Sequence, residues 1–371
     1  MSGGVDSSVA ALLLKEQGYE VIGAHMVCWE GCELKEERRD AMRVAAKLGI
    51  PFFTFDFRKE YRLRVFEYMI REYAQGRTPN PDVMCNKYIK FGLFLTKALE
   101  RGADYIATGH YVRIQDSKIK NQNERPKFKI FEARDKSKDQ SYFLWTLTQE
   151  QLRHCLFPMG GYLKSEVREI ARRAGLPTAE KKDSQGLCFV GKVDFGEFLR
   201  SLLPNVPGAI VSPTGKVVGG HDGAHFYTIG QRHGLELGGF PSPLYVAEKR
   251  PRTNTLVVTE EGENSPLYRK GCLVQEVNWI SPDRAVFPLS CQARIRYRQP
   301  LEEAHIMKPE TDKGRFTIHN SDFLIRFVKA QRAVASGQSM VFYQSHEMLG
   351  GGIITDRTGL PGEPRLGDET P

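Results

Sequence analysis

The first half of the chain alternates helical and strand-like patterns of apolar residues. A helical run over 9–14 ends at Gly18, and a continuous apolar run over 20–27 then predicts a buried strand. The same patterns predict further helices over 34–48, 59–73 and 87–100, and further strands over 52–57 and 104–108. Helices that separate short apolar strands usually cover both faces of a parallel sheet, so this half predicts an α/β domain.

The second half differs, because glycine and proline become frequent beyond residue 203. Alternating apolar and polar runs predict β strands over 209–211, 256–259, 292–297 and 340–343. We place domain boundaries near Pro204 and Gly271. The predicted plan is an α/β domain over 1–203, a central β domain over 204–270, a C-terminal β domain over 271–356 and a disordered tail over 357–371.

Composition narrows the class of protein. Lysine and arginine outnumber aspartate and glutamate by 53 to 45 in 371 residues, and this excess favours a polyanionic partner such as nucleic acid. The seven cysteines are irregularly spaced and odd in number, which argues against a secreted disulfide framework. No apolar run is long enough for a membrane span, so we expect a cytoplasmic protein.

The segment SGGVDSS, directly after Met1, has the composition of an anion-binding loop. Its glycines allow backbone N–H groups to converge on phosphate oxygens, and a helix that follows adds the positive end of its dipole. Ser2, Ser7 and Ser8 add hydroxyl donors. The Walker pattern is absent, which argues against transfer of a γ-phosphoryl group. An ordinary glycine-rich turn before a helix is the alternative interpretation.

Two segments carry candidate nucleophiles: GRTPNPDVMCNKYIKFG contains Cys85, and KKDSQGLCFVG contains Cys188. Both are rich in turn residues and basic residues, so each cysteine is expected on a loop beside cations that favour the thiolate. The alternative is that both are small buried residues. That alternative is our prediction for the remaining cysteines: Cys28, Cys32, Cys155, Cys272 and Cys291. No zinc site is expected, because the spacing of Cys28 and Cys32 could serve a metal but no second pair of ligands has a similar spacing.

A third candidate is the segment QARIRYRQ. Arg294, Arg296 and Arg298 occupy every second position, so a strand would place all three guanidinium groups on one face. Such a row suits the phosphates of a nucleic acid. A charged edge strand that discourages aggregation is the alternative.

Further motifs follow SGGVDSS in order: GRTPNPD, IKFG, ADYIATGHY, KDQSYFL, LCFVG, YTIGQR, RYRQ and VFY. On these motifs the chain resembles the tRNA-specific 2-thiouridylases, which belong to the PP-loop ATP pyrophosphatases. The resemblance implies an adenine nucleotide α hydrolase-like parallel sheet domain, a central β domain around YTIGQRHGL and a C-terminal β-barrel. It also implies an ATP-dependent sulfurtransferase that adenylates the C2 oxygen of the wobble uridine of a tRNA and replaces it with sulfur.

The resemblance also implies site residues. The ATP site would comprise Ser2, Gly3, Gly4, Val5, Asp6, Ser7, Met26 and Gly109. The pocket for the target base would comprise Asn80, Pro81 and Asp82, and the tRNA contacts Lys138, Asp139, Gln140, Arg296 and Tyr297. Without the resemblance, Met26 would be assigned to the core and Gly109 to a simple turn.

The resemblance gives the cysteines distinct roles. Cys188 matches a persulfide carrier, loaded by an upstream donor such as a cysteine desulfurase or a relay protein, and Cys85 matches the partner thiol. Attack of Cys85 on the persulfide would leave a Cys85–Cys188 disulfide that needs an external reductant. Asp82 fits a general acid or base near the target base, with a capping role as the alternative. ATP and Mg²⁺ are the implied cofactors, and we expect a monomer without a protein metal site.

The chain departs from the family at its start. Family members have an apolar strand directly before the loop, and Met1 leaves no room for one. We therefore expect the first strand of the sheet to be missing through a misplaced start. A mitochondrial location stays open, since a targeting segment would precede Ser2.

Two other functions remain open at this point. A PP-loop ligase or amidotransferase that acts on a small metabolite would form AMP without RNA and would give the cysteine pair no role. A tRNA-binding protein that has lost catalysis would bind RNA without ATP turnover.

Overall fold

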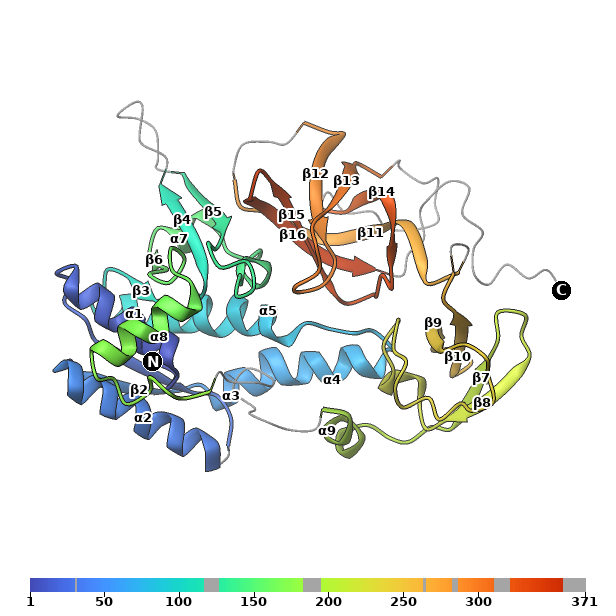
Figure 1. Cartoon of the computed structure of the whole chain (residues 1–371), viewed down its shortest axis with the longest axis horizontal. Coiled ribbons are helices and arrows are strands. Elements are labelled where there is room, and N and C mark those ends of the chain that lie inside the picture. Colours follow the sequence, from blue (N-terminus) through green and yellow to red (C-terminus); the bar gives the residue numbers. More distant parts are fainter. Residues whose placement is uncertain are drawn as a thin grey trace.

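The computed structural model describes residues 1–30, 32–116, 127–182, 195–262, 265–281, 286–309 and 321–355. Figure 1 shows a helix-rich N-terminal part in blue and green, a small β domain in yellow and a β-barrel in orange and red. Over these described ranges, no helix combines the length and the apolar character needed to cross a membrane.

Short parallel strands lie at the centre of the N-terminal part. β1 (Gly23–Val27) pairs in parallel with β2 (Phe52–Asp56). β3 (Ile106–Ala107) pairs in parallel with β6 (Cys155–Leu156). The strands expected over 20–27, 52–57 and 104–108 are therefore present in shorter form. Their parallel pairing among helices confirms the predicted α/β class.

Helices flank these strands. Apart from two longer helical stretches, the helices are α1 (Val5–Glu16), α2 (Cys32–Leu48), α7 (Gln149–Leu152), α8 (Lys164–Arg173) and α9 (Phe195–Leu202). Short 3₁₀ turns occupy Ser141–Phe143 and Ala224–Phe226. α1 packs against α8, and Val9, Val167 and Ala171 are fully buried in one apolar cluster.

Two longer helical stretches each contain a π-helical segment. The first consists of α3 (Arg58–Tyr61), a π segment (Arg62–Phe66) and α4 (Glu67–Ala74). The second consists of α5 (Pro81–Cys85), a π segment (Asn86–Phe94) and α6 (Leu95–Leu99). The second stretch begins at Pro81 and not at 87, where the sequence predicted its start. The earlier start arises because Asn80 caps the helix and Pro81 occupies its first position.

The segment before α1 lies against β1. The amine of Met1 donates to the carbonyl oxygen of Ala24, and the carbonyl oxygen of Met1 lies 3.0 Å from Nδ1 of His25. Burial lowers the pKa of the Met1 amine to about 5. The strand expected ahead of the loop concerns residues that would precede Met1, so that expectation stays a prediction.

The central domain is a four-stranded sheet with the order β8, β7, β10, β9. Its strands are β7 (Gly208–Val211), β8 (Val217–His221), β9 (Leu244–Arg250) and β10 (Thr255–Glu260). Ile210, Val246 and Leu256 are fully buried in one apolar cluster with residues between β8 and β9. The small central β structure agrees with the expectation from sequence.

The C-terminal strands form a closed barrel, because β11 pairs with both β14 and β16. The barrel strands are β11 (Tyr268–Trp279), β12 (Leu289–Arg294), β13 (Glu302–Met307), β14 (Phe323–Arg332), β15 (Ser339–Gln344) and β16 (Glu347–Thr355). Phe342 stacks on Trp279 in its core, with ring centroids 5.6 Å apart. The predicted C-terminal β-barrel is confirmed.

A hairpin from the N-terminal part extends the barrel sheet. Its strands are β4 (Val112–Asp116) and β5 (Phe128–Glu132), and β5 pairs antiparallel with β16. Figure 1 shows this hairpin between the α/β helices and the barrel. Main-chain pairing therefore connects the N-terminal part with the C-terminal barrel, which the sequence did not predict.

Candidate functional site

The SGGVDSS segment forms a tight loop at the start of α1. Gly3 has a φ of +76°, and a Cβ atom there would collide with the backbone of Glu37, so this position requires glycine. The hydroxyl groups of Ser2 and Ser7 lie 3.1 Å apart, and the backbone N–H of Ser2 donates to the Ser7 hydroxyl. α1 follows from Val5, so its first-turn N–H groups and dipole favour an anion at this loop.

Asp6, in the first turn of α1, is held from two distant segments. The Tyr111 hydroxyl donates to Oδ1 of Asp6 at 2.8 Å. The Lys164 ammonium donates to Oδ1 at 2.6 Å and to Oδ2 at 2.8 Å. These contacts fix the orientation of a carboxylate that lies beside the anion-binding N–H groups.

Gly109 packs directly on the same loop. A Cβ atom at Gly109 would lie 2.9 Å from the backbone nitrogen of Ser7 and 3.0 Å from the carbonyl carbon of Asp6. The structure therefore brings Gly109 to the loop, and its contact with the nucleotide stays a prediction. Met26 lies on β1 and packs, partly buried, against the core of the N-terminal part, and its role at the adenine stays a prediction.

The close approach of Gly109 gives a testable expectation. In a Gly109→Ala variant the added methyl group displaces Ser7 and Asp6, so we expect the Kd for ATP to rise about 10-fold or more. Isothermal titration calorimetry measures this change. Gly161→Ala is the matched control, because a Cβ atom at Gly161 has no neighbour within 4 Å. Equal ATP affinity of the Gly109 variant and the wild type would contradict the contact.

Cys85 occupies a helix, so the expectation of a loop cysteine is wrong. It is the last residue of α5 and is fully buried. The cap explains the helix: the backbone N–H of Val83 donates to Oδ1 of Asn80 at 3.2 Å, and Pro81 follows in the first position. Asp82 lies in the first turn, three positions before Cys85, and this spacing places both side chains on one helix face.

Cys188 lies outside the described residues, so the Cys85–Cys188 pair stays a prediction. The remaining cysteines with described side chains agree with the expectation of small buried residues: Cys28, Cys155, Cys272 and Cys291. Burial raises the pKa of Cys155 to about 12, and its thiol donates to the Gln151 carbonyl at 3.1 Å. Thiols of this kind are unreactive at neutral pH.

The predicted row of arginines does not exist. β12 ends at Arg294, and residues 295–298 turn away from the strand direction, with Arg298 at a φ of +64°. Arg294 is buried, whereas Arg296 donates to the carbonyl oxygens of Ile229 and Ala333 at 2.7 and 3.0 Å. The Arg296 guanidinium therefore holds the barrel against the central domain, and a shared phosphate-binding face is excluded.

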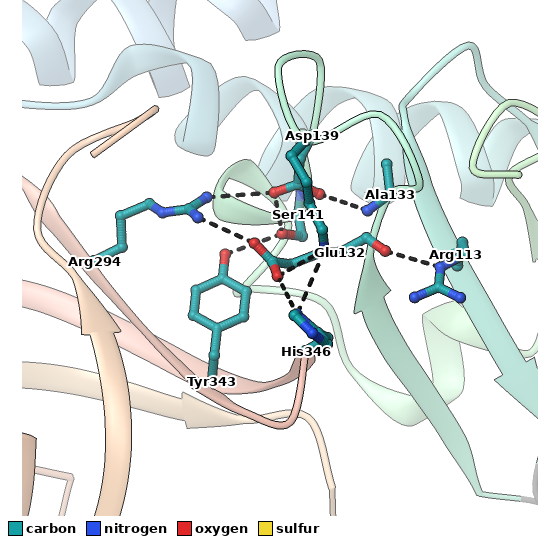
Figure 2. Close-up of polar contacts among 9 residues, drawn as sticks. Arg113, Glu132, Ala133, Asp139, Ser141, Arg294, Tyr343 and His346 are labelled. Atoms are coloured by element: carbon teal, nitrogen blue, oxygen red, sulfur yellow. Dashed lines mark hydrogen bonds and ion pairs between the residues drawn. The ribbon is translucent and has the colours of Figure 1, made fainter. Parts of the chain in front are cut away.

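Arg294 instead enters a buried ionic cluster with the N-terminal part. Figure 2 shows Arg294 and His346 of the barrel turned toward Glu132 and Asp139. Arg294 donates to Glu132 at 3.0 Å and to Asp139 at 3.4 Å, and His346 Nδ1 lies 2.9 Å from Glu132. Burial acts to raise the pKa of Glu132, but hydrogen bonds from Lys136 and His346 and the charge of Arg294 hold it below its usual value.

The predicted tRNA contacts Lys138, Asp139 and Gln140 lie beside this cluster. Asp139 is 2% exposed, and its carboxylate accepts hydrogen bonds from the Ala133 backbone at 2.9 Å and the Ser141 hydroxyl at 2.8 Å. We therefore correct the role of Asp139 from a direct RNA contact to a residue that shapes the segment. Lys138 is only half-buried and stays a predicted contact.

Gln140 connects this segment to the nucleotide loop. The side-chain Oε1 of Gln140 accepts from the backbone N–H of Tyr111 at 3.0 Å, and the backbone N–H of Gln140 donates to the Tyr111 carbonyl at 2.9 Å. Tyr111 in turn holds Asp6. The KDQ segment therefore supports the anion-binding loop.

Comparison with known proteins agrees with this arrangement. Family models match in succession: the tRNA methyl transferase HUP domain over 1–192, the tRNA methyl transferase PRC-barrel domain over 196–260 and the aminomethyltransferase β-barrel domain over 269–354. The chain is 47% identical over 362 residues to tRNA-specific 2-thiouridylase MnmA 2 of Geobacillus kaustophilus, with 96% of this chain and 93% of the relative covered. It is 46% identical over 365 residues to tRNA-specific 2-thiouridylase MnmA of Methylobacillus flagellatus, with 96% and 97% covered.

The chain belongs to the tRNA-specific 2-thiouridylase family. Its HUP domain followed by PRC-barrel and β-barrel domains confirms the predicted fold class. Within this 2-thiouridylase fold, the structure adds residues that the sequence did not single out as functional. Tyr111 follows Gly109 by two positions in the TGHY motif, so a local signal was available. Lys164 and Glu132, one of the two partners of Arg294, come from distant segments, for which no local signal exists.

The donor set of the 2-thiouridylase loop fits the phosphates of ATP. Backbone N–H groups of the first turn and the Ser2 and Ser7 hydroxyls supply neutral donors. Among the residues described, no group of three or more His, Cys, Asp and Glu side chains could enclose a metal ion. A magnesium ion usually enters such sites with the substrate phosphates and one or two carboxylates. Asp6 is the carboxylate of this loop, and its side chain keeps 33% of its surface accessible.

Proposed function

We propose that this protein is an ATP-dependent tRNA-uridine 2-sulfurtransferase, which converts the wobble uridine of a tRNA to 2-thiouridine. The observation that carries this proposal is its likeness to 2-thiouridylases over nearly the full length of both chains. The loop of Ser2 to Ser7, closed by Gly109 and Tyr111, supports the use of ATP.

The chemistry requires an activated oxygen. The C2 carbonyl of uracil has no leaving group, so its oxygen first attacks the α-phosphorus of ATP and pyrophosphate departs. The first-turn N–H groups of α1 stabilise the departing phosphates. Asp82, in the first turn of α5, acts as a general acid or base at the uracil. Mg²⁺ would shield the phosphate charges. Sulfide then adds to C2, and AMP leaves with the oxygen that belonged to the uridine.

The sulfur arrives through the cysteine pair. A persulfide donor loads Cys188, and the Cys85 thiolate attacks the inner sulfur of the persulfide, Sγ of Cys188, so that the outer sulfur departs. This attack forms the Cys85–Cys188 disulfide and releases sulfide at the activated base. An external dithiol then reduces the disulfide, so two thiols and one reductant are needed for each turnover. The protein acts as a monomer with tRNA, and the proposed RNA contacts are Lys138, Gln140, Arg296 and Tyr297.

The proposed function is tested by incubating the protein with ATP, Mg²⁺, sulfide and tRNA that lacks the modification. We expect a thiolated tRNA band, retarded in a mercury-containing gel, that requires ATP. The same tRNA with cytidine at the wobble position is the control and should give no retarded band. Formation of AMP without RNA, together with no thiolated tRNA, would indicate a small-metabolite ligase instead. Binding of tRNA without ATP turnover would indicate a catalytically inactive binder.

A further inference from the structure

The proposed ATP site lacks a positive charge. Its residues include the Asp6 carboxylate but no lysine or arginine: Ser2, Gly3, Gly4, Val5, Asp6, Ser7, Met26 and Gly109. The reaction displaces pyrophosphate, whose negative charge increases as the bond to the α-phosphorus breaks. Enzymes that transfer phosphate-linked groups normally place a lysine, an arginine or a metal ion at this charge. Mg²⁺ would neutralise part of this charge, and a cationic side chain that shares this role must come from another segment of the chain.

Lys164 provides an ammonium group at this position. It is the first residue of α8, and its Nζ donates to both oxygens of Asp6, at 2.6 and 2.8 Å. Nζ also lies 5.7 Å from the centroid of the Tyr111 ring, so Lys164, Asp6 and Tyr111 form one group. The start of α8 is itself fixed, because the Lys164 backbone N–H donates to Oδ2 of Asp135 at 2.9 Å.

A purely structural role explains the pair less well. The contact between α1 and α8 is already apolar, through the buried Val9, Val167 and Ala171. A partly buried ion pair is weak evidence for stability, because loss of hydration offsets the attraction. The Lys164 side chain is 12% exposed, whereas the Asp6 side chain keeps 33% of its surface accessible. The pair is therefore open on the side of the carboxylate, where a ligand can approach.

We propose that Lys164 is the phosphate-binding cation of the nucleotide site and that its ammonium group contacts the pyrophosphate portion of ATP. The inference rests on the function proposed above and adds a binding residue to the same site. The unbranched stem of lysine lets Nζ move from Asp6 to a phosphate oxygen while the backbone of α8 stays in place. Asp6 and Tyr111 position the ammonium group when no nucleotide is bound.

The test compares nucleotides that differ only in their β- and γ-phosphates. For Lys164→Met, we expect the Kd for ATP to rise about 10- to 100-fold, whereas the Kd for AMP changes less than about 2-fold. Lys164→Arg keeps the charge and should restore most of the affinity for ATP. Titration calorimetry with ATP and AMP measures both constants, and thermal melting verifies that each variant is folded.

Arg172→Met is the matched control, because Arg172 lies on the same helix and pairs with Glu180 at 2.7 Å on the exposed surface. Its Kd for ATP should equal that of the wild type. Equal loss of ATP and AMP affinity in Lys164→Met would assign Lys164 to loop structure, and unchanged ATP affinity would remove it from the site. Either result, with a wild type that thiolates tRNA, overturns only this inference. A wild type that binds ATP but never thiolates tRNA would overturn the proposed function instead.

Discussion

Replacing Cys85 by serine is expected to reduce 2-thiouridine formation by about 10³-fold or more, while ATP binding stays unchanged. A serine hydroxyl is almost fully protonated at neutral pH and is a poor nucleophile toward sulfur, so the persulfide on Cys188 would not be opened. Cys85 is fully buried at the end of α5, and serine is close to it in size, so the helix should persist. Initial rates with a persulfide donor, read by mercury-gel retardation, measure the effect.

Cys155→Ser is the matched control for this experiment. Cys155 is also buried, and a serine hydroxyl there can donate to the same Gln151 carbonyl that accepts from the thiol. We expect the Cys155 variant to thiolate tRNA at the rate of the wild type. A Cys85→Ser enzyme that works at the rate of this control would show that sulfur transfer does not use Cys85.

Replacing Arg294 by methionine is expected to lower the free energy of unfolding by about 3–5 kcal/mol. Arg294 donates to Glu132 and Asp139, which are 3% and 2% exposed. Methionine fills much of the space but carries no positive charge, so both buried carboxylates lose the guanidinium group that pairs with them. Because this cluster joins the barrel to the β4–β5 hairpin, the loss should appear as a lower Tm in differential scanning calorimetry.

An exposed arginine on the barrel gives the comparison. Arg326 lies on β14 and is exposed, so Arg326→Met should change the stability by no more than about 0.5 kcal/mol. Adding Asp139→Asn to Arg294→Met should recover part of the loss, because it removes one uncompensated carboxylate. If Arg294→Met melts like the Arg326 variant, the cluster does not hold the two parts together.

The sequence predicts the parts of the fold that follow from local patterns. Short apolar runs between helices indicated the parallel strands β1, β2 and β3, and alternating runs indicated the β-rich second half. The expectation of a loop around Cys85 is wrong, because turn residues in a sequence do not by themselves specify a loop. Asn80 and Pro81 are also the residues that cap and start a helix, and here that second meaning applies.

Contacts between distant segments could not be predicted in this way. The regular spacing of Arg294, Arg296 and Arg298 suggested one charged face, but the strand ends at Arg294. The partners of Arg294 are Glu132 and Asp139, which lie 162 and 155 positions earlier in the chain. The pair of Lys164 with Asp6 likewise spans 158 positions. No periodicity records such pairs, because only the packed fold brings them together.

The origin of the oxygen in AMP tests the central claim most directly. The thiolation reaction is run in water enriched in ¹⁸O, and the AMP is analysed by mass spectrometry alongside the 2-thiouridine. If the C2 oxygen of uridine attacks ATP and leaves with AMP, the AMP formed with each 2-thiouridine carries no ¹⁸O. AMP that carries one ¹⁸O atom for each 2-thiouridine would mean that water cleaves the ATP, and adenylation of the uridine would be contradicted.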